Sequence, residues 1–195
     1  MKIQPEKLYH VYNQGNNKEL IFGDRADYLL FLEKIKLFIA PESTILAYCL
    51  MPNHFHFLLE ATKRSCEEIK VGSLFLTRLT NALRLVQSNY AQVYNKKYAR
   101  TGSLFRQKTK FKELGSSRNA FICFHYIHQN PVKAQLVEKL EEWEFSSFKD
   151  FANLRNGLLP NKEKAFLLLE IDEKNFVENS YSVISPELIE KLVLV

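Results

Sequence analysis

Residues 51–60 have the sequence MPNHFHFLLE, in which His54 and His56 stand on either side of Phe55. The flanking residues are aliphatic and aromatic, a composition typical of a β-strand. On a strand, side chains at positions i and i+2 point to the same face. Both imidazoles should therefore project together while Phe55 enters the core. Two convergent neutral imidazoles form half of a metal site.

The pattern around this stretch predicts alternating strands and helices. Strands are expected at 8–13, at 44–50 and from 54 onward, and the tight turn at 51–53 makes the last two an antiparallel hairpin. Asp24 can cap a helix that runs to about residue 40. A longer helix is expected from residue 67 or 73 to about 93, with Leu74 and Leu76 among its inward residues.

The second half continues the same alternation. Residues 103–114 are expected to form a loop and a strand, and Ser116 or Ser117 can cap a helix over 118–130. Pro131 should end that helix, because the residue before a proline avoids helical geometry. Further helices are expected over 161–170 and from Pro186.

The pattern changes near residue 156, and we divide the chain into a main domain, 1–150, and a helical appendage, 151–195, that is not an independent domain. From 156 onward there are four basic residues against seven acidic ones. Because its net charge is negative, such a segment would bind phosphates poorly, and we expect it to pack against the rest of the chain or to contact a partner.

The bulk composition indicates an ordinary globular protein. The 195 residues are 46% hydrophobic and 25% charged. No apolar run approaches the roughly 20 residues of a membrane span, and residues 1–6 lack the apolar core of a signal peptide, so a cytoplasmic location is expected. Three dispersed cysteines without a C-x-x-C pair argue against disulfides and thiolate zinc sites.

The charge is distributed unevenly. Residues 69–112 hold ten basic residues and no acidic one, which leaves 17 basic against 22 acidic residues in the rest of the chain. A long stretch free of carboxylates favours contact with a polyanion, although a solvated basic face is the simpler alternative. The cations that we expect to bind DNA are Lys96, Lys97, Arg100, Arg106, Lys108, Lys110 and Lys112.

A second polar cluster lies in residues 124–131, FHYIHQNP. In the last turn of a helix, Tyr126 and Asn130 share one face, which pairs a phenol with an amide oxygen suited to Mg²⁺ or Mn²⁺. His125 and Gln129 make a competing pair on the adjacent face. Ile127 is expected to pack inward.

Five blocks of sequence occur in an order that is recognisable. They are YHVYNQG at 9–15, MPNHFH at 51–56, GSLF at 102–105, YIHQNPVKA at 126–134 and WEFSS at 143–147. Together they resemble the single-tyrosine transposases with an HUH (His-hydrophobic-His) motif, most closely the REP-associated tyrosine transposase branch, over residues 5–150. Gln107 and the basic run 106–110 depart from the common form of the family, which leaves details of the substrate open.

The resemblance implies an α+β fold, a ferredoxin-like antiparallel sheet with helices packed on one side. It implies an enzyme that cuts and rejoins single-stranded DNA, often near a hairpin, through a 5′-phosphotyrosine intermediate. Tyr126 would be the nucleophile, and His54, His56 and Asn130 would hold Mg²⁺ or Mn²⁺. Free tyrosine has a pKa of about 10, so Tyr126 needs activation by the metal or by His125 or His128. Some members of the family are dimers, and the oligomeric state of this chain stays open.

Several alternatives accompany this assignment. His54 and His56 could be a satisfied polar pair or structural zinc ligands, and Asn130 could merely cap a helix. His10 could support the metal site or be an ordinary strand residue. Asn53 is expected to shape the turn before the histidines. The rival functions are a nucleic-acid-binding regulator on the same fold and a hydrolytic metal nuclease that leaves no covalent product.

Overall fold

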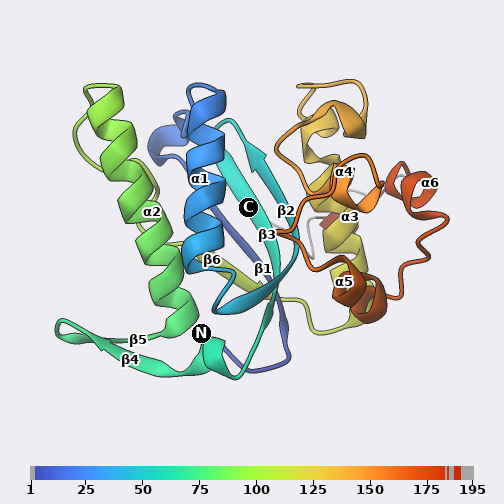
Figure 1. Ribbon diagram of the computed structural model, residues 1–195, viewed down its shortest axis with the longest axis horizontal. Helices are drawn as coiled ribbons and strands as arrows, with labels where there is room; N and C mark the ends of the chain where they lie inside the picture. The colour runs from blue at the N-terminus through green and yellow to red at the C-terminus, as the bar shows by residue number, and fades with distance from the viewer. Residues whose placement is uncertain (1–2, 183, 185–186, 190–195) are drawn as a thin grey trace.

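A four-stranded antiparallel sheet lies at the centre of the protein (Figure 1), and the computed structural model describes residues 3–182, 184 and 187–189. Its strands are β1 (Leu8–Gln14), β2 (Ser43–Met51), β3 (His54–Ala61) and β6 (Lys110–Glu113), in the order β2-β3-β1-β6. A two-residue turn joins β2 to β3 in the predicted hairpin. With the two helices described next, the sheet has the ferredoxin-like element order that the sequence predicts.

Two long helices cover one face of this sheet. The first, α1 (Arg25–Phe38), begins as predicted at Asp24, whose side chain accepts from the Asp27 backbone N–H in a capping box. The second is α2 (Arg78–Lys97). Phe31 of α1 and Tyr90 of α2 are fully buried against Val11 and Phe55 of the sheet. The prediction of helices packed on one side describes this layer.

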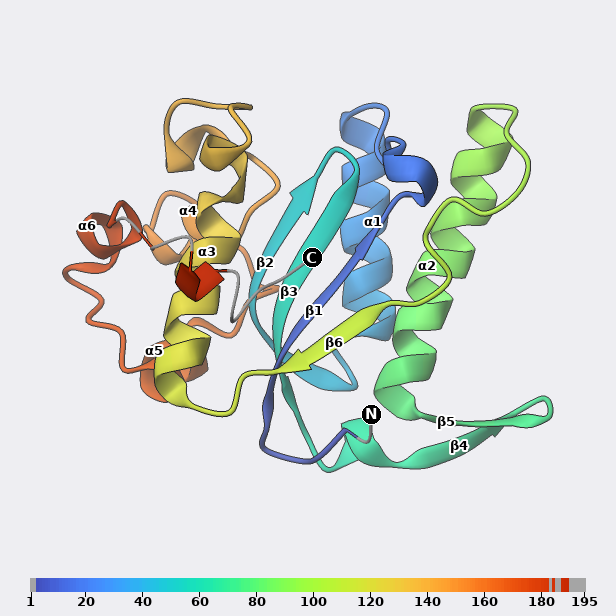
Figure 2. The same ribbon diagram turned by 180° about the vertical axis from the view of Figure 1, so that it is seen from behind.

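A second layer covers the opposite face (Figure 2). It is formed by α3 (Ser117–Lys133) with the short helices α4 (Phe148–Phe151), α5 (Lys162–Leu169) and α6 (Phe176–Ser180). Phe124 and Ile127 of α3 share a core with Cys49 and Leu58 of the sheet. Because both faces are buried, β2 is an almost continuous apolar run rather than an alternating one.

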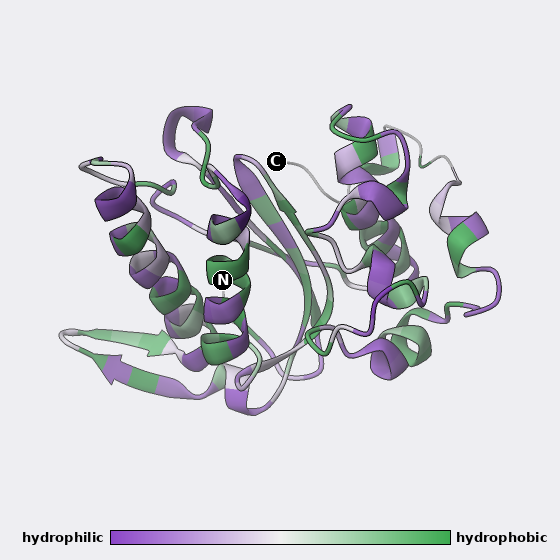
Figure 3. Ribbon diagram, turned by 45° about the horizontal axis from the view of Figure 1, so that its top comes forward, coloured by the Kyte–Doolittle hydropathy of each residue, from purple (hydrophilic) through white to green (hydrophobic). Residues whose placement is uncertain are grey.

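Residues 67–77 do not begin the long helix, and this part of the prediction is wrong. They include β4 (Glu68–Val71) and β5 (Leu74–Thr77), a hairpin that projects from the body as an arm (Figure 1). Gly72 at its tip has a φ of 61°, a left-handed conformation that glycine adopts without strain. Figure 3 shows β5 as a hydrophobic strand beside an alternating β4, and Leu74, predicted to face inward, is 61% exposed.

Pro131 does not end its helix, so that prediction is also wrong. The helix α3 continues to Lys133 with Pro131 buried inside it. Proline lacks the N–H that would bond to Ile127, four residues earlier. The side-chain amide of Asn130 lies 3.5 Å from that carbonyl and donates to the Tyr126 carbonyl at 2.9 Å. These contacts partly replace the lost backbone hydrogen bond at the end of the helix.

The C-terminal segment packs against α3. The predicted helix over 161–170 is confirmed as α5, capped by Asn161, whereas Ser185 and Pro186, where a last helix was expected to start, lie outside the described residues. Single 3-10 turns occur at η1 (Asn16–Lys18), η2 (Arg64–Cys66) and η3 (Leu140–Glu142). The division of the chain near residue 150 stays a prediction. No helix within the described ranges is both long and apolar enough to cross a membrane.

The N-terminus of α3 supplies a test of the fold. Ser116 accepts from the Asn119 backbone N–H at 3.2 Å, whereas Ser117 is the first helical residue. Ser116→Ala should lower the free energy of unfolding by about 1 kcal/mol, because the cap is lost. Ser117→Ala, the matched control, should stay within about 0.5 kcal/mol. Urea unfolding followed by circular dichroism measures both, and equal losses would contradict the assigned cap.

Candidate functional site

The two histidines of β3 share one face of the sheet, as predicted. Their ring centroids are 5.0 Å apart and the rings are nearly perpendicular. Phe55 between them is fully buried in the other core, among the residues under α1 and α2. The alternation of the strand therefore places both imidazoles on the side covered by α3.

His10 of β1 forms a direct hydrogen bond with His56. The His10 Nε2 atom lies 2.9 Å from His56 Nδ1, and the two rings stack with centroids 5.0 Å apart. Both side chains are almost completely buried. Of the two alternatives for His10, the structure places it against the candidate ligand rather than in an unrelated part of the strand.

Burial keeps these imidazoles neutral. It lowers the pKa of His10 to about 3, with a smaller effect from Lys112, and that of His54 to about 4. Desolvation, helped by the neighbouring histidines, also puts the pKa of His56 well below its ordinary value. Neutral imidazole is the form that binds metal ions.

Two ring nitrogens at this site have no hydrogen-bond partner among the described residues. They are His56 Nε2 and His10 Nδ1, and both are buried. If His56 Nδ1 donates to His10, then His56 Nε2 carries a free lone pair. An unsatisfied, buried and neutral imidazole nitrogen fits a metal ligand.

Asn53 orients His54 as well as the turn. Its Oδ1 lies 2.6 Å from His54 Nδ1, and its Nδ2 donates to the Lys18 carbonyl at 3.2 Å. A hydrogen bond at Nδ1 leaves Nε2 as the ligating atom. The sequence predicted the role in the turn and missed the contact with the ring, although adjacency at the strand start is a signal that could have found it.

Tyr126 lies edge-on to the same histidines. Its ring centroid is 5.8 Å from that of His56 and 6.4 Å from that of His10. Desolvation raises the pKa of Tyr126 to about 12, while the hydrogen bond from Asn130 lowers it by a smaller amount. The structure thus brings Tyr126 of α3 against His56 of β3, and Asn130 contacts Tyr126 from within α3.

A second tyrosine, Tyr12 of β1, was missed. It stands opposite His56 in the β1–β3 pairing, and its ring stacks on His10 at 4.7 Å between centroids. Its pKa is raised by burial. The YHVY spacing at 9–12, which puts residues 10 and 12 on one face, is the signal that could have found it.

His125 and His128 make their hydrogen bonds away from this site. His125 Nδ1 lies 3.0 Å from the Ser180 hydroxyl, and His128 Nε2 lies 2.8 Å from that of Ser147. Gln129 donates to the Ser180 carbonyl at 2.9 Å. His125 and Gln129 thus bind α6, and His128 binds the residue before α4, which leaves little support for the idea that either histidine activates Tyr126.

The predicted DNA-binding cations fall into two groups. Lys97 pairs with Asp24 and Asp27 at 2.7 and 2.8 Å, and Arg100 pairs with Glu19. Acidic residues from distant segments neutralise both. Lys96, Arg106, Lys108 and Lys110 are exposed, and Lys112 is half-buried on β6.

A metal site at this position would need ligands of more than one type. No cluster of three or more His, Cys, Asp or Glu side chains placed to hold a metal occurs in the part of the chain that the structure describes. A site here would combine the two imidazoles of β3 with the amide oxygen of Asn130, the set that the sequence predicted. The free His56 nitrogen fits such a site.

Comparison with known proteins places the fold. No protein-family model and no curated protein matches the chain. A solved structure of a REP-associated tyrosine transposase bound to a REP hairpin matches with a TM-score of 0.62 at 14% identity, covering 78% of this chain and 82% of that one. The chain therefore has the fold of that transposase, as the sequence resemblance predicted.

The five histidines supply a second test. Burial lowers the pKa of all of them, to about 4 for His125 and well below normal for His128. Below pH 6.5 the unfolded chain binds protons that the folded chain does not, so stability falls as the pH falls. Each imidazole should cost about 1 kcal/mol between pH 7 and 5.5.

Urea unfolding of the metal-free protein at the two pH values measures this loss. The control is His125→Gln, which should reduce the pH dependence by the share of one imidazole. A free energy of unfolding that is equal at pH 7 and pH 5.5 would contradict the burial of neutral histidines.

Proposed function

We propose that this protein is a metal-dependent single-stranded DNA transposase or endonuclease that cuts and rejoins DNA through a 5′-phosphotyrosine intermediate. One observation carries the proposal. The Tyr126 phenol from α3 lies against His56 and His10 from two different strands, with Asn130 one helical turn further on. The match to the transposase fold supports it. The proposed partner is single-stranded DNA that bears a hairpin.

The reaction assigned to Tyr126 needs no external energy source, because one P–O bond forms as another breaks. Its oxygen attacks the scissile phosphorus, the Oη–P bond forms as the P–O3′ bond breaks, and the departing strand takes up a proton as a 3′-OH. The 5′ end stays joined to the enzyme, so the energy of the phosphodiester is kept for rejoining. The phenol loses its proton as it attacks, which balances the proton that the 3′ oxygen takes up, and burial raises the pKa of the phenol in the free protein to about 12.

His54, His56 and Asn130 would hold a divalent cation, which polarises the scissile phosphate and stabilises charge on its oxygens. Imidazole nitrogen suits first-row transition ions better than it suits Mg²⁺, so Mn²⁺ is the preferred ion in this proposal. Asn53 and His10 orient the two imidazoles from outside the ligand set.

Two other functions use the same fold. A regulator that binds nucleic acid without cutting it would not need a buried His56 nitrogen free of any described partner, and this observation favours the enzyme. A hydrolytic nuclease would cleave without a covalent product, which the next experiment detects.

The nucleophile is tested with a pool of hairpin-bearing single strands with randomised flanks, labelled at the 5′ and 3′ ends, and Mn²⁺. The wild type should give a denaturation-resistant adduct with the fragment downstream of the cut, and Tyr126→Phe should give none. Tyr12→Phe is the matched control, because Tyr12 stacks on the same histidine, and it should still form the adduct. Cleavage that persists in Tyr126→Phe would contradict the assignment of Tyr126 as the nucleophile.

The metal ligands are tested by separating binding from cutting. His56→Gln should abolish Mn²⁺ binding, measured by electron paramagnetic resonance of the free ion, and should abolish cleavage. His10→Gln should weaken Mn²⁺ binding by about 10–100-fold, since it removes a partner that orients a ligand. Affinity for single-stranded DNA in EDTA should change less than about threefold in both. A His56→Gln protein with wild-type Mn²⁺ affinity would contradict the site.

A further inference from the structure

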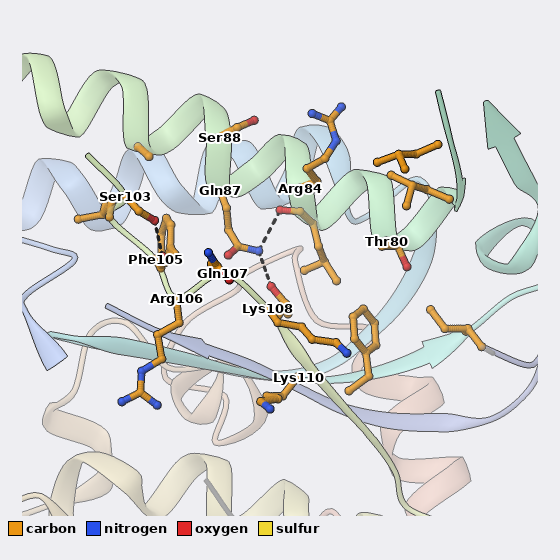
Figure 4. Close-up of a pocket in the computed structure, with 18 of the residues that line it drawn as sticks. Thr80, Arg84, Gln87, Ser88, Ser103, Phe105, Arg106, Gln107, Lys108 and Lys110 are labelled. Atoms are coloured by element: carbon orange, nitrogen blue, oxygen red, sulfur yellow. Dashed lines mark hydrogen bonds between the residues drawn. The ribbon is translucent and has the colours of Figure 1, made fainter. Parts of the chain in front are cut away.

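A groove of about 740 Å³ opens beside α2, away from the histidine site. Its walls are α2, the β5 strand of the arm and residues 102–111, which lead into β6 (Figure 4). The volume lies within the range of about 300–1,000 Å³ that is usual for pockets that hold small organic ligands. A nucleotide is a ligand of that size.

The interior of the groove is largely apolar. Leu83 and Phe105 line its buried part, and Leu74 and Leu76 of β5 line the side formed by the arm. Leu74 is 61% exposed, which leaves an apolar side chain open to a ligand in the groove. Apolar side chains in such a groove offer a contact surface to the face of an unpaired base, because burying apolar area is favourable.

The rim of the groove is positively charged. Arg84 stands on α2, while Arg106, Lys108 and Lys110 lie on the facing segment (Figure 4). No carboxylate lines the groove, and none of these four cations belongs to an ion pair among the residues that the structure describes. Lys97 and Arg100, by contrast, are neutralised. The charge of the rim therefore complements a polyanion.

One wall of the groove is fixed to the central strand. The Asn13 amide donates to Gln87 at 2.6 Å and to Thr109 at 3.2 Å, and Gln87 in turn donates to Thr109 at 2.7 Å. This network joins β1, α2 and the segment before β6. It holds the groove open at a set width rather than leaving its shape to a loose loop.

The edge strand β6 connects the groove to the histidine site. In its pairing with β1, Lys112 stands opposite His10, and Lys110, which also lines the groove, stands opposite Tyr12. Cross-strand partners share a face of the sheet, so these lysines lie on the face of the imidazoles. A strand of DNA can follow them from Tyr126, over the edge of the sheet, into the groove.

We propose that the groove binds unpaired nucleotides of the same DNA strand that Tyr126 cuts, with bases against Leu74 and Leu76 and phosphates on the cationic rim. The inference rests on the proposed function for its substrate class. It adds a base-binding subsite on the far side of β6 from the reacting phosphate.

Base contact is tested with two strands of equal charge, a 20-nucleotide thymidine strand and an abasic strand of the same length. In EDTA, the wild type should bind the thymidine strand at least about tenfold more tightly, because its bases bury apolar area that the abasic strand lacks. Leu74→Ser should reduce this preference. Phe75→Ser, also on the exposed arm at 69% exposure but outside the groove lining, should leave the preference unchanged.

Phosphate contact is tested by salt dependence. In Arg106→Gln/Lys108→Gln the slope of log affinity against log salt should fall by about 1.4, since each contact to a single strand contributes about 0.7. The control Lys36→Gln/Lys63→Gln removes the same charge from exposed sites elsewhere, and its slope should not change.

Unchanged base preference in Leu74→Ser, or an unchanged slope in the rim variant, would overturn the proposal. It would also be overturned by tight binding of a poly-glutamate peptide that depends on the rim while strand binding does not, a result that identifies a protein partner. Failure of the proposed function gives a different result. If strand binding depends on the groove but no Tyr126 adduct forms, the proposed function is contradicted and the proposal for the groove is supported. If the Tyr126 adduct forms but the groove variants bind strands as the wild type does, only the proposal for the groove is overturned.

Discussion

The hydrogen bond between His10 and His56 is the contact on which the site depends. It joins neighbouring strands at the centre of the sheet, where neither ring can reach water. Burial removes the charge from both rings, and the bond between them leaves one nitrogen of His56 to face a third group. The β1–β3 pairing thus orients His56 so that one of its ring nitrogens is available as a candidate metal ligand. Tyr126 reaches His56 only because α3 packs on that same face.

The sequence predicted the parts of the fold that depend on local patterns. Alternation placed His54 and His56 on one face, and side-chain caps at Asp24, Ser116 and Asn161 marked helix starts. Two local rules gave the wrong result. The spacing of Leu74 and Leu76 suggested a helix, but turn residues at the tip of the arm favour a hairpin, and Pro131 is accommodated because the side chain of Asn130 partly replaces the missing donor.

Features that depend on distant pairs were beyond the sequence. The acid-free stretch predicted a uniform row of cations, yet Lys97 and Arg100 meet acids from residues 19–27 across the fold. Arg106, Lys108 and Lys110 form a narrower basic surface that leads to the edge strand β6. The YHVY spacing puts His10 and Tyr12 on one face, but their contacts with His56 follow from the β1–β3 register, which no local pattern fixes.

The tautomer of His56 decides whether its buried ring nitrogen can bind a cation. Nuclear magnetic resonance of the metal-free protein with ¹⁵N-labelled histidine reports which ring nitrogen carries the proton. We expect a neutral His56 at pH 7 with its proton on Nδ1, donated to His10 Nε2, and an unprotonated Nε2. A proton on Nε2, or a charged ring, would leave no lone pair for a cation and would contradict the proposed site.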